Sequence, residues 1–290
     1  MNSHQFCRDI CLERGEPMQG AGETQSRYVL LQWPRRHWRV PRINSQEMTP
    51  ALSQAIVTAH RAGIHVALVE GDDIALSCED RIARALSAEE AATRIEQLAS
   101  GETMHGEIDE RITILCCTDG KQDPCCARFG FATYKALREH ADPSIFRVLQ
   151  STHLGGCRFA ASLLVLPSRE RYGRLEPGDV PDFLQSLQDG LPYLEAYRGN
   201  PRLDEASQVA EHAALSFASD LGLRLPVSSV QLSRADQSGG DAEFVAFLND
   251  VKLHIRLRSS AFEVNTRCST VGQSTSETSC WSVVSLEALD

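Results

Sequence analysis

Soft metal ligands are concentrated in one part of this 290-residue chain, between positions 112 and 167. Five of the ten cysteines lie there, namely Cys116, Cys117, Cys125, Cys126 and Cys157. His153 precedes the last of them by four positions. Thiolates with one imidazole suit zinc or an iron–sulfur cluster, whereas magnesium and calcium prefer oxygen ligands. Eight residues separate Cys117 from Cys126, which exceeds the spacing of a zinc finger or ribbon and favours the larger body of a cluster.

Each cysteine doublet offers a choice of ligand. Successive side chains on an extended strand point to opposite faces, so only one thiolate of a doublet easily faces a given centre. The run Arg111–Cys116 predicts a strand that delivers the first doublet at its carboxyl end, where sites gather in open α/β sheets. Cys125 and Cys126 stand at the start of a predicted helix that ends near His140, where free N–H groups stabilise thiolates. Residue types alone leave either member of the second doublet open.

Around these cysteines the chain resembles the sucrase/ferredoxin-like family, whose core is a thioredoxin-like [2Fe–2S] ferredoxin. The specific part of the resemblance is the cysteine loop together with the H-x-G-G motif. The matching segments are C-T-D-G-K-Q-D-P-C-C (117–126), H-L-G-G-C-R-F-A-A (153–161), L-V-L-P (164–167), Y-G-R-L (172–175) and Y-R-G (197–199). The opening segments 12–21 and 28–34 fit as well, so the resemblance touches nearly the whole chain.

The resemblance implies a ligand set, and the chain departs from the commoner pattern at two positions. Asp119 stands where the family often has a histidine, and Cys157 stands where many members carry a second histidine. Members with two histidines are expected to use two cysteines and two histidines, and the simpler ferredoxins use four cysteines. This chain looks like an intermediate between the two kinds, with three cysteines and one histidine. The implied ligands of a [2Fe–2S] cluster are Cys117, Cys126, His153 and Cys157.

The function implied by the resemblance is one-electron transfer to an unidentified redox partner protein, rather than catalysis. Gly155 and Gly156 lie between the last two candidate ligands. Glycine lets the backbone approach a cofactor closely and leaves N–H groups free to bond sulfur, so we expect both to contact the cluster. Hydrogen bonds to sulfur make reduction of the cluster easier, and so does an imidazole ligand in place of a thiolate.

The strands and helices that would position these residues follow a thioredoxin-like order. The Arg111–Cys116 strand, the helix to His140 and the strand Phe146–Gln150 form β-α-β. The runs Ser162–Leu166 and Tyr172–Leu175 then predict an antiparallel hairpin, followed by a helix from Pro181 to about Gly190. We therefore predict an α/β fold with a thioredoxin-like ferredoxin module over residues 107–192.

Two regions flank this module. In residues 1–106, the apolar runs Tyr28–Trp33 and His65–Glu70 enclose a helical pattern over Met48–Arg61, which predicts a parallel βαβ unit. Ser87 and Glu90 form a capping box for a helix that ends before Gly101. Residues 193–290 begin with a capped helix, Asp204–Leu221, and continue as strand-like runs, so this region is predicted to be α+β.

Composition narrows the function classes. Hydrophobic residues make up 42% and charged residues 23%, which is typical of a globular protein with a sizeable core. The formal net charge of −10 argues against a nucleic-acid partner and allows a basic redox partner to be attracted. No apolar run has the roughly 20 residues that span a bilayer, and the first residues lack the apolar core of a secretory signal. We expect a cytoplasmic protein without a membrane partner, where clustered thiols serve as metal ligands.

Three other classes use the same residues differently. A zinc-stapled structural module would take the same ligands but bind no iron. A thiol oxidoreductase would use the cysteines directly, although the chain lacks a C-x-x-C motif in this module. Sucrose hydrolysis, suggested by the family's description, needs two carboxylates flanking the bond, and no acidic pair stands in a recognisable glycosidase context.

Two further pairs of cysteines that are close in sequence lie outside the module. A short helix over residues 3–14 would place Cys7 and Cys11 on one face, either as a second thiol pair or metal site or as small buried residues, and we favour packing. Cys268 and Cys280 flank a Ser/Thr-rich loop and are predicted to be unpaired thiols rather than a redox pair.

Overall fold

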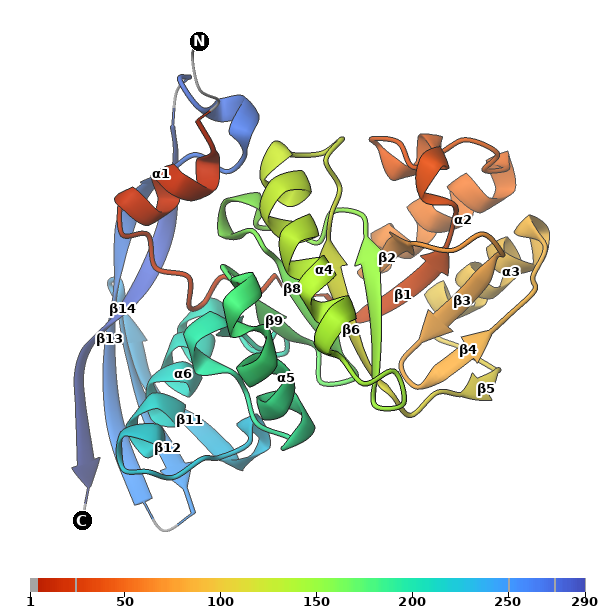
Figure 1. Ribbon diagram of the computed structural model, residues 1–290. Coiled ribbons are helices and arrows are strands. Elements are labelled where there is room, and N and C mark those ends of the chain that lie inside the picture. The colour runs from red at the N-terminus through yellow and green to blue at the C-terminus, as the bar shows by residue number, and fades with distance from the viewer. Residues whose placement is uncertain (1–4, 24, 250, 274, 290) are drawn as a thin grey trace.

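The chain forms two β-sheets with helices packed around them (Figure 1). The computed structural model describes residues 5–23, 25–249, 251–273 and 275–289. One sheet has ten strands in the order β10-β9-β8-β6-β7-β2-β1-β3-β4-β5, and the other has four in the order β11-β12-β13-β14. The large sheet is mixed and the small sheet is antiparallel, which confirms the predicted α/β class with an additional α+β region.

The bounds of the regular elements are as follows. The large sheet contains β1 (Arg27–Gln32), β2 (Ile64–Val69), β3 (Ala75–Cys78), β4 (Arg81–Ala83), β5 (Glu107–Ile108), β6 (Ile112–Cys117), β7 (Phe146–Ser151), β8 (Leu163–Leu166), β9 (Glu170–Tyr172) and β10 (Tyr197–Gly199). The small sheet contains β11 (Val230–Ser238), β12 (Asp241–Leu248), β13 (Val251–Val264) and β14 (Ser276–Leu289). The helices are α1 (Cys7–Glu13), α2 (Pro50–Arg61), α3 (Ala88–Ala99), α4 (Phe131–His140), α5 (Val180–Gln188) and α6 (Glu205–Asp220).

The N-terminal βαβ unit is confirmed. β1 and β2 are parallel, and α2 connects them. Helix α3 begins at a reciprocal capping box, in which the Ser87 hydroxyl accepts from the N–H of Glu90 and the Glu90 carboxylate accepts from the N–H of Ser87. Both helices bury their apolar faces against β1, β2 and β3. The helix predicted over residues 3–14 is present as α1, although positions 3 and 4 lie outside the described residues.

The thioredoxin-like order is present in the second half of the large sheet. β6 and β7 are parallel, β8 is antiparallel to β6, and β9 is antiparallel to β8. Helices α4 and α5 cover one face of these strands, as Figure 1 shows, and share an apolar core with them. The second hairpin strand differs from its prediction, since it ends at Tyr172 instead of beginning there. Arg174 has a φ of 55°, which extended backbone cannot continue through.

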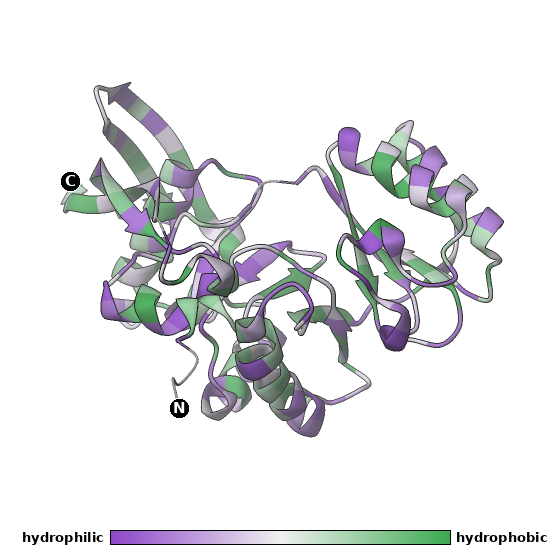
Figure 2. Cartoon of the chain, turned by 90° about the horizontal axis from the view of Figure 1, so that it is seen from above, coloured by the Kyte–Doolittle hydropathy of each residue, from purple (hydrophilic) through white to green (hydrophobic). Residues whose placement is uncertain are grey.

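The two halves of the large sheet meet where β2 lies beside β7. Val69 pairs with Ser151, and the N–H of Thr152 donates to the carbonyl of Leu68 at 2.9 Å. Strands from residues 1–106 and 107–192 therefore belong to one sheet, and the division of the chain at those boundaries stays a prediction. The interior strands are mostly hydrophobic, while the helices carry both hydrophobic and hydrophilic residues (Figure 2).

The C-terminal sheet packs on α6. The alternating burial of β12 directs Ala242, Phe244, Ala246 and Leu248 toward this helix, which presents small residues such as Ala210 and Ala214 in return. On its other side α6 contacts β10, where Tyr197 donates to Glu211. No helix in the described part of the chain is long and apolar enough to cross a membrane.

Candidate metal centre

The candidate ligands come together because β6 and β7 run parallel and end at the same edge of the sheet. Cys117, the last residue of β6, lies beside Ser151, the last residue of β7. His153 follows two residues after Ser151 and is therefore delivered to the same edge. This is the edge where the carboxyl ends of strands place functional groups in open α/β sheets.

The loop after β6 returns the second cysteine to the first. The N–H groups of Gln122 and Asp123 both donate to the carbonyl of Asp119 at 3.1 Å, which closes a tight turn. The chain enters a helix at Pro124, widens into a π-helix over Cys126–Gly130 and continues as α4. Single π-turns of this kind often occur at functional sites, because the extra residue re-aims the side chains on that turn.

Three of the four candidate ligands form one compact group. The ligand atoms of Cys117, Cys126 and His153 all lie within 4.8 Å of one another. The Sγ atom of Cys157 lies 3.4 Å from Nδ1 of His153, which extends the group to the fourth candidate. The three cysteines are at most 3% exposed and His153 is partly exposed, so the imidazole is the member of the set nearest to solvent.

The close contacts shift the proton affinities of these groups. A hydrogen bond from Cys126 lowers the pKa of Cys117 well below its ordinary value, against the opposing effect of burial, and His153 adds to the lowering. Cys126 also forms a hydrogen bond with Cys157, which lowers the pKa of the Cys157 thiol to about 7. Burial lowers the pKa of His153, but its hydrogen bonds to Cys117 and Cys157 and their charges raise it to about 10. The thiols of Cys117 and Cys157 and the imidazole of His153 therefore stabilise one another's charged forms.

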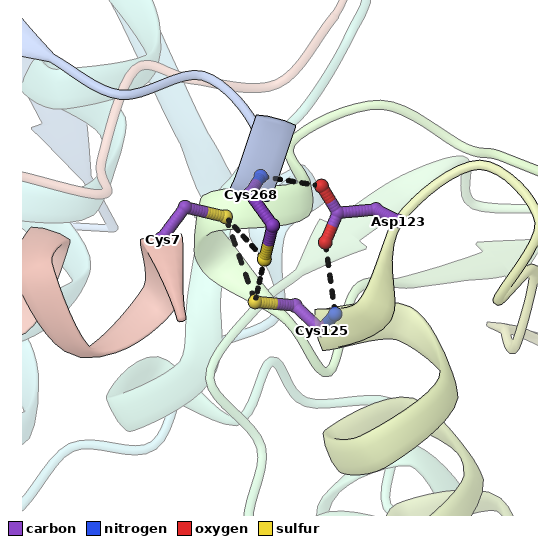
Figure 3. Close-up of side chains that lie close together, drawn as sticks. All are labelled: Cys7, Asp123, Cys125 and Cys268. Carbon is purple, nitrogen blue, oxygen red and sulfur yellow. Dashed lines mark hydrogen bonds between the residues drawn. The ribbon is translucent and has the colours of Figure 1, made fainter. Parts of the chain in front are cut away.

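The two members of each cysteine doublet face different surroundings. Cys116 lies on the opposite side of β6, where its Sγ donates to the carbonyl of Gly130 at 3.2 Å inside the core shared with α4 and α5. Cys125 faces Cys7 at 3.5 Å and Cys268 at 3.2 Å, as drawn in Figure 3. The geometry therefore leaves Cys117 and Cys126 as the members that face His153.

The glycine pair shapes the loop that carries His153 and Cys157. Gly155 and Gly156 have φ values of 88° and 71°, which side-chain-bearing residues rarely adopt. A Cβ at Gly155 would meet the Glu23 carboxylate at 2.1 Å, and one at Gly156 would meet the Arg198 guanidinium at 2.6 Å. The glycines thus make room for Glu23 and Arg198, and their contact with a cofactor stays a prediction.

Asp119 joins the two ligand loops. Burial raises the pKa of its carboxyl group, and so does the charge of Cys117, while hydrogen bonds from the backbone N–H groups of His153 and Gln122 oppose the rise. Asp119 therefore holds the backbone of His153 to the cysteine loop. Residue types alone did not reveal this contact, because the partner N–H lies 34 positions further along the chain.

A cavity of about 260 Å³ borders the site on the side of His153. Its walls include His153, Asp119, Arg39 and Arg42. Arg42 donates to the backbone carbonyl of His153 at 3.0 Å and contacts Nε2 of His65 at 3.2 Å. The imidazole thus borders a hollow whose walls carry two guanidinium groups.

Fold and site together define a class: an α/β protein with a thioredoxin-like module and a buried, thiolate-rich group of residues capable of binding a metal. A family model described as sucrase/ferredoxin-like matches residues 18–199. Since this match covers more than half of the chain, the protein belongs to the sucrase/ferredoxin-like family, which confirms the resemblance seen in the motifs. The match excludes α1, α6 and the small sheet.

Among solved structures, the chain is similar to a thioredoxin-like [2Fe–2S] ferredoxin from Aquifex aeolicus. The two share 20% identity with a TM-score of 0.28, over 30% of this chain and 90% of that one. A cysteine-to-serine variant of the same ferredoxin matches at 19% identity and a TM-score of 0.27, over 30% of this chain and 96% of that one. The search of curated proteins gave no significant match.

Proposed function

We propose that this protein is a one-electron carrier that binds a [2Fe–2S] cluster through Cys117, Cys126, His153 and Cys157. The observation that carries the proposal is the convergence of three buried sulfurs and one imidazole from two loops at one sheet edge. Membership of the sucrase/ferredoxin-like family supports it.

The donor set fits such a cluster in number and type. Cys117 and Cys126 form one neighbouring pair, and His153 and Cys157, at 3.4 Å, form the other. Two pairs of ligands are what two bridged irons require, one pair for each iron. Thiolates and imidazoles are the ligands found on such irons, and no carboxylate is needed in the set.

The residues of the chain would hold the cluster and shield it from solvent, while the bound cluster supplies the one-electron chemistry. The three cysteines provide negative charge in a site almost closed to water, which limits side reactions of the sulfur. His153 replaces one thiolate by a neutral ligand, which lowers the negative charge of the site and favours reduction. Its second ring nitrogen can carry a proton whose loss would couple to the loss of an electron.

The redox partner, in this proposal, approaches at the cavity beside His153. That cavity borders the least buried ligand and has Arg39 and Arg42 in its walls. A third basic residue, Lys121, donates to the backbone carbonyl of Trp38, which precedes Arg39 in the chain. This local positive charge contrasts with the net charge of −10 and suits an acidic patch on the partner. The sequence-based expectation of a basic partner concerned the whole chain, whereas this site favours the opposite local charge.

A cytoplasmic location is part of the proposal. No disulfide joins any of the ten cysteines, all of which lie in the described part of the chain, and nine of them are buried. A cluster bound by thiolates needs a reducing compartment, because oxidation to disulfides would remove its ligands.

Anaerobic purification followed by an absorption spectrum and by iron and sulfide analysis tests the proposal. We expect a coloured protein with about two irons and two sulfides per chain that dithionite bleaches. Cys280→Ser serves as a matched control, because this half-buried cysteine lies outside the group, and it should leave the colour unchanged. A colourless protein that binds one zinc through these residues and does not react with dithionite would show a structural zinc module instead.

A further inference from the structure

A second group of sulfurs lies next to the proposed cluster site, and the proposed function does not use it. It consists of Cys7, Cys125 and Cys268, together with the carboxylate of Asp123 (Figure 3). The ligand atoms of all four lie within 4.8 Å of one another, and all four residues are buried. Cys7 and Cys268 lie outside residues 18–199, so the family match does not account for this group.

We propose that this group binds one zinc ion, with Cys7, Cys125 and Cys268 as thiolate ligands and a carboxylate oxygen of Asp123 available as the fourth. The inference is independent of the cluster, because the two groups share no residue.

The sulfur triangle has the size that a single ion requires. The Sγ–Sγ distances are 3.2 Å for Cys125–Cys268, 3.5 Å for Cys7–Cys125 and 3.7 Å for Cys7–Cys268. Three thiolates bound tetrahedrally to one zinc with bonds of about 2.3 Å have sulfurs about 3.8 Å apart. An expansion by a few tenths of an ångström would therefore admit the ion. A disulfide would join only two of the three sulfurs and needs a separation of about 2.05 Å.

The backbone around the sulfurs donates hydrogen bonds to them. The N–H of Arg8 points at the sulfur of Cys125, and the N–H of Cys7 points at the sulfur of Cys268. Hydrogen bonds of this kind stabilise thiolates bound to a metal and fix the direction of each sulfur. The first residues of α1 thus contact the sulfurs of Cys125 and Cys268, and Cys7 of the same helix supplies the third sulfur.

Asp123 ties the two remaining ligand segments together. One carboxylate oxygen accepts from the N–H of Cys125 and the other from the N–H of Cys268, both at 2.8 Å (Figure 3). The residue is 1% exposed, and in the described part of the chain no Lys, Arg or His forms an ion pair with it. A buried carboxylate facing three thiols is costly without a cation, and a divalent ion would supply the missing positive charge.

The choice of zinc follows from the ligands and the spacing. Magnesium and calcium prefer oxygen, and a set dominated by sulfur selects zinc or iron in a tetrahedral site. Three thiolates and one carboxylate oxygen fill the four positions of a single tetrahedral ion. A closed site, in which four protein ligands leave no open position on the ion, is typical of structural zinc.

A zinc ion at this group would link segments near both ends of the chain to the thioredoxin-like module. Cys7 begins α1, Cys125 lies on the cysteine loop, and Cys268 lies in the turn Cys268–Thr270 between β13 and β14. Figure 1 shows this turn beside α1. Helix α1 also packs on the segment Cys157–Phe159, so the zinc would hold it over the loop that carries a proposed cluster ligand.

Metal analysis of the full chain and of three variants tests the proposal. Zinc, iron and sulfide are measured per chain after anaerobic purification from cells supplied with both metals. We expect about one zinc in the wild type. Cys268→Ser should lower zinc at least about tenfold and leave iron unchanged. Cys126→Ser should lower iron and leave zinc unchanged, while Cys280→Ser should change neither. Zinc that persists in Cys268→Ser, or iron at this group in place of zinc, would overturn the proposal.

A second measurement guards against misfolding of the variant. The Cys126→Ser chain is stripped with a chelator and titrated with Co²⁺ alone, which reports thiolate ligation through its charge-transfer absorption. We expect saturation at about one ion per chain, with the intense absorption of a tetrahedral thiolate site. No such absorption, or a Cys125–Cys268 disulfide found in the freshly purified wild-type chain by peptide mapping without reductant, would exclude the zinc site.

Discussion

Cys125 and Cys126 are neighbours in the chain, yet their sulfurs face two different groups. Cys125 lies 3.2 Å from the sulfur of Cys268, whereas Cys126 belongs with Cys117 and His153. The start of a helix separates them, because consecutive residues there point about 100° apart around the helix axis. The doublet thus contributes one sulfur to each of the two groups.

Serine at each of these two positions should therefore have different effects. Cys126→Ser removes a proposed cluster ligand, so we expect the visible absorption and most of the roughly two irons per chain to disappear. Cys125→Ser should keep the absorption, because its sulfur faces the other group. Visible spectra and iron analysis of the two purified variants check this. Equal loss of iron in both would mean that the doublet acts as one ligand unit.

Much of this arrangement follows from local sequence signals. The β6–α4–β7 order, the parallel βαβ unit and the cap at Ser87 were all predicted, because apolar periodicity and capping residues act over a few positions. The group around Asp123 was not, since its partners Cys7 and Cys268 lie 116 and 145 positions away. Only the folding of α1 and the β13–β14 turn onto the cysteine loop brings them together. The predicted alternatives for Cys7 and Cys268 considered only their neighbours in sequence, Cys11 and Cys280.

Replacing His153 by cysteine tests the imidazole ligand. His153→Cys adds a negative thiolate, so we expect the reduction potential of the bound cluster to fall by on the order of 100 mV. In the wild type, loss of the imidazole proton adds negative charge as the pH rises, so the potential should fall by up to about 59 mV per pH unit. The variant should show no such slope above neutral pH. Voltammetry between pH 6 and 10 measures both quantities, and an unchanged slope would show that His153 is not a ligand.

The basic wall of the cavity should govern the rate of electron exchange with anions. Arg39 is partly exposed and lines the cavity beside His153. Arg39→Glu reverses its charge, so the reduced protein should react several-fold more slowly with ferricyanide at low ionic strength, and the difference should shrink as salt screens the charges. Lys252→Glu, at an exposed position on β13, is the matched control. Stopped-flow kinetics measure the rates. Equal slowing by both substitutions would indicate an effect of net charge and not of the cavity.

The pH dependence of stability should contain a contribution from Glu211. This residue is 3% exposed on α6 and accepts a hydrogen bond from Tyr197 at 2.7 Å. Burial raises the pKa of its carboxyl group to about 7, although the Tyr197 bond opposes the rise. The folded chain therefore holds this proton more tightly than the unfolded chain, whose pKa is near 4.5. The stabilisation is fully present below pH 4.5 and is lost as the pH rises through 7.

Glu211→Gln removes this contribution, because glutamine keeps a hydrogen-bond acceptor for Tyr197 but does not ionise. At about 1.4 kcal/mol for each pKa unit, the wild type should lose up to about 3 kcal/mol relative to the variant between pH 4.5 and 8. Urea unfolding at several pH values measures the difference. Glu205→Gln, at an exposed position on the same helix, should leave the wild-type slope intact. If the stabilities of the wild type and Glu211→Gln ran parallel across this range, the buried carboxyl group would not be the cause of the slope.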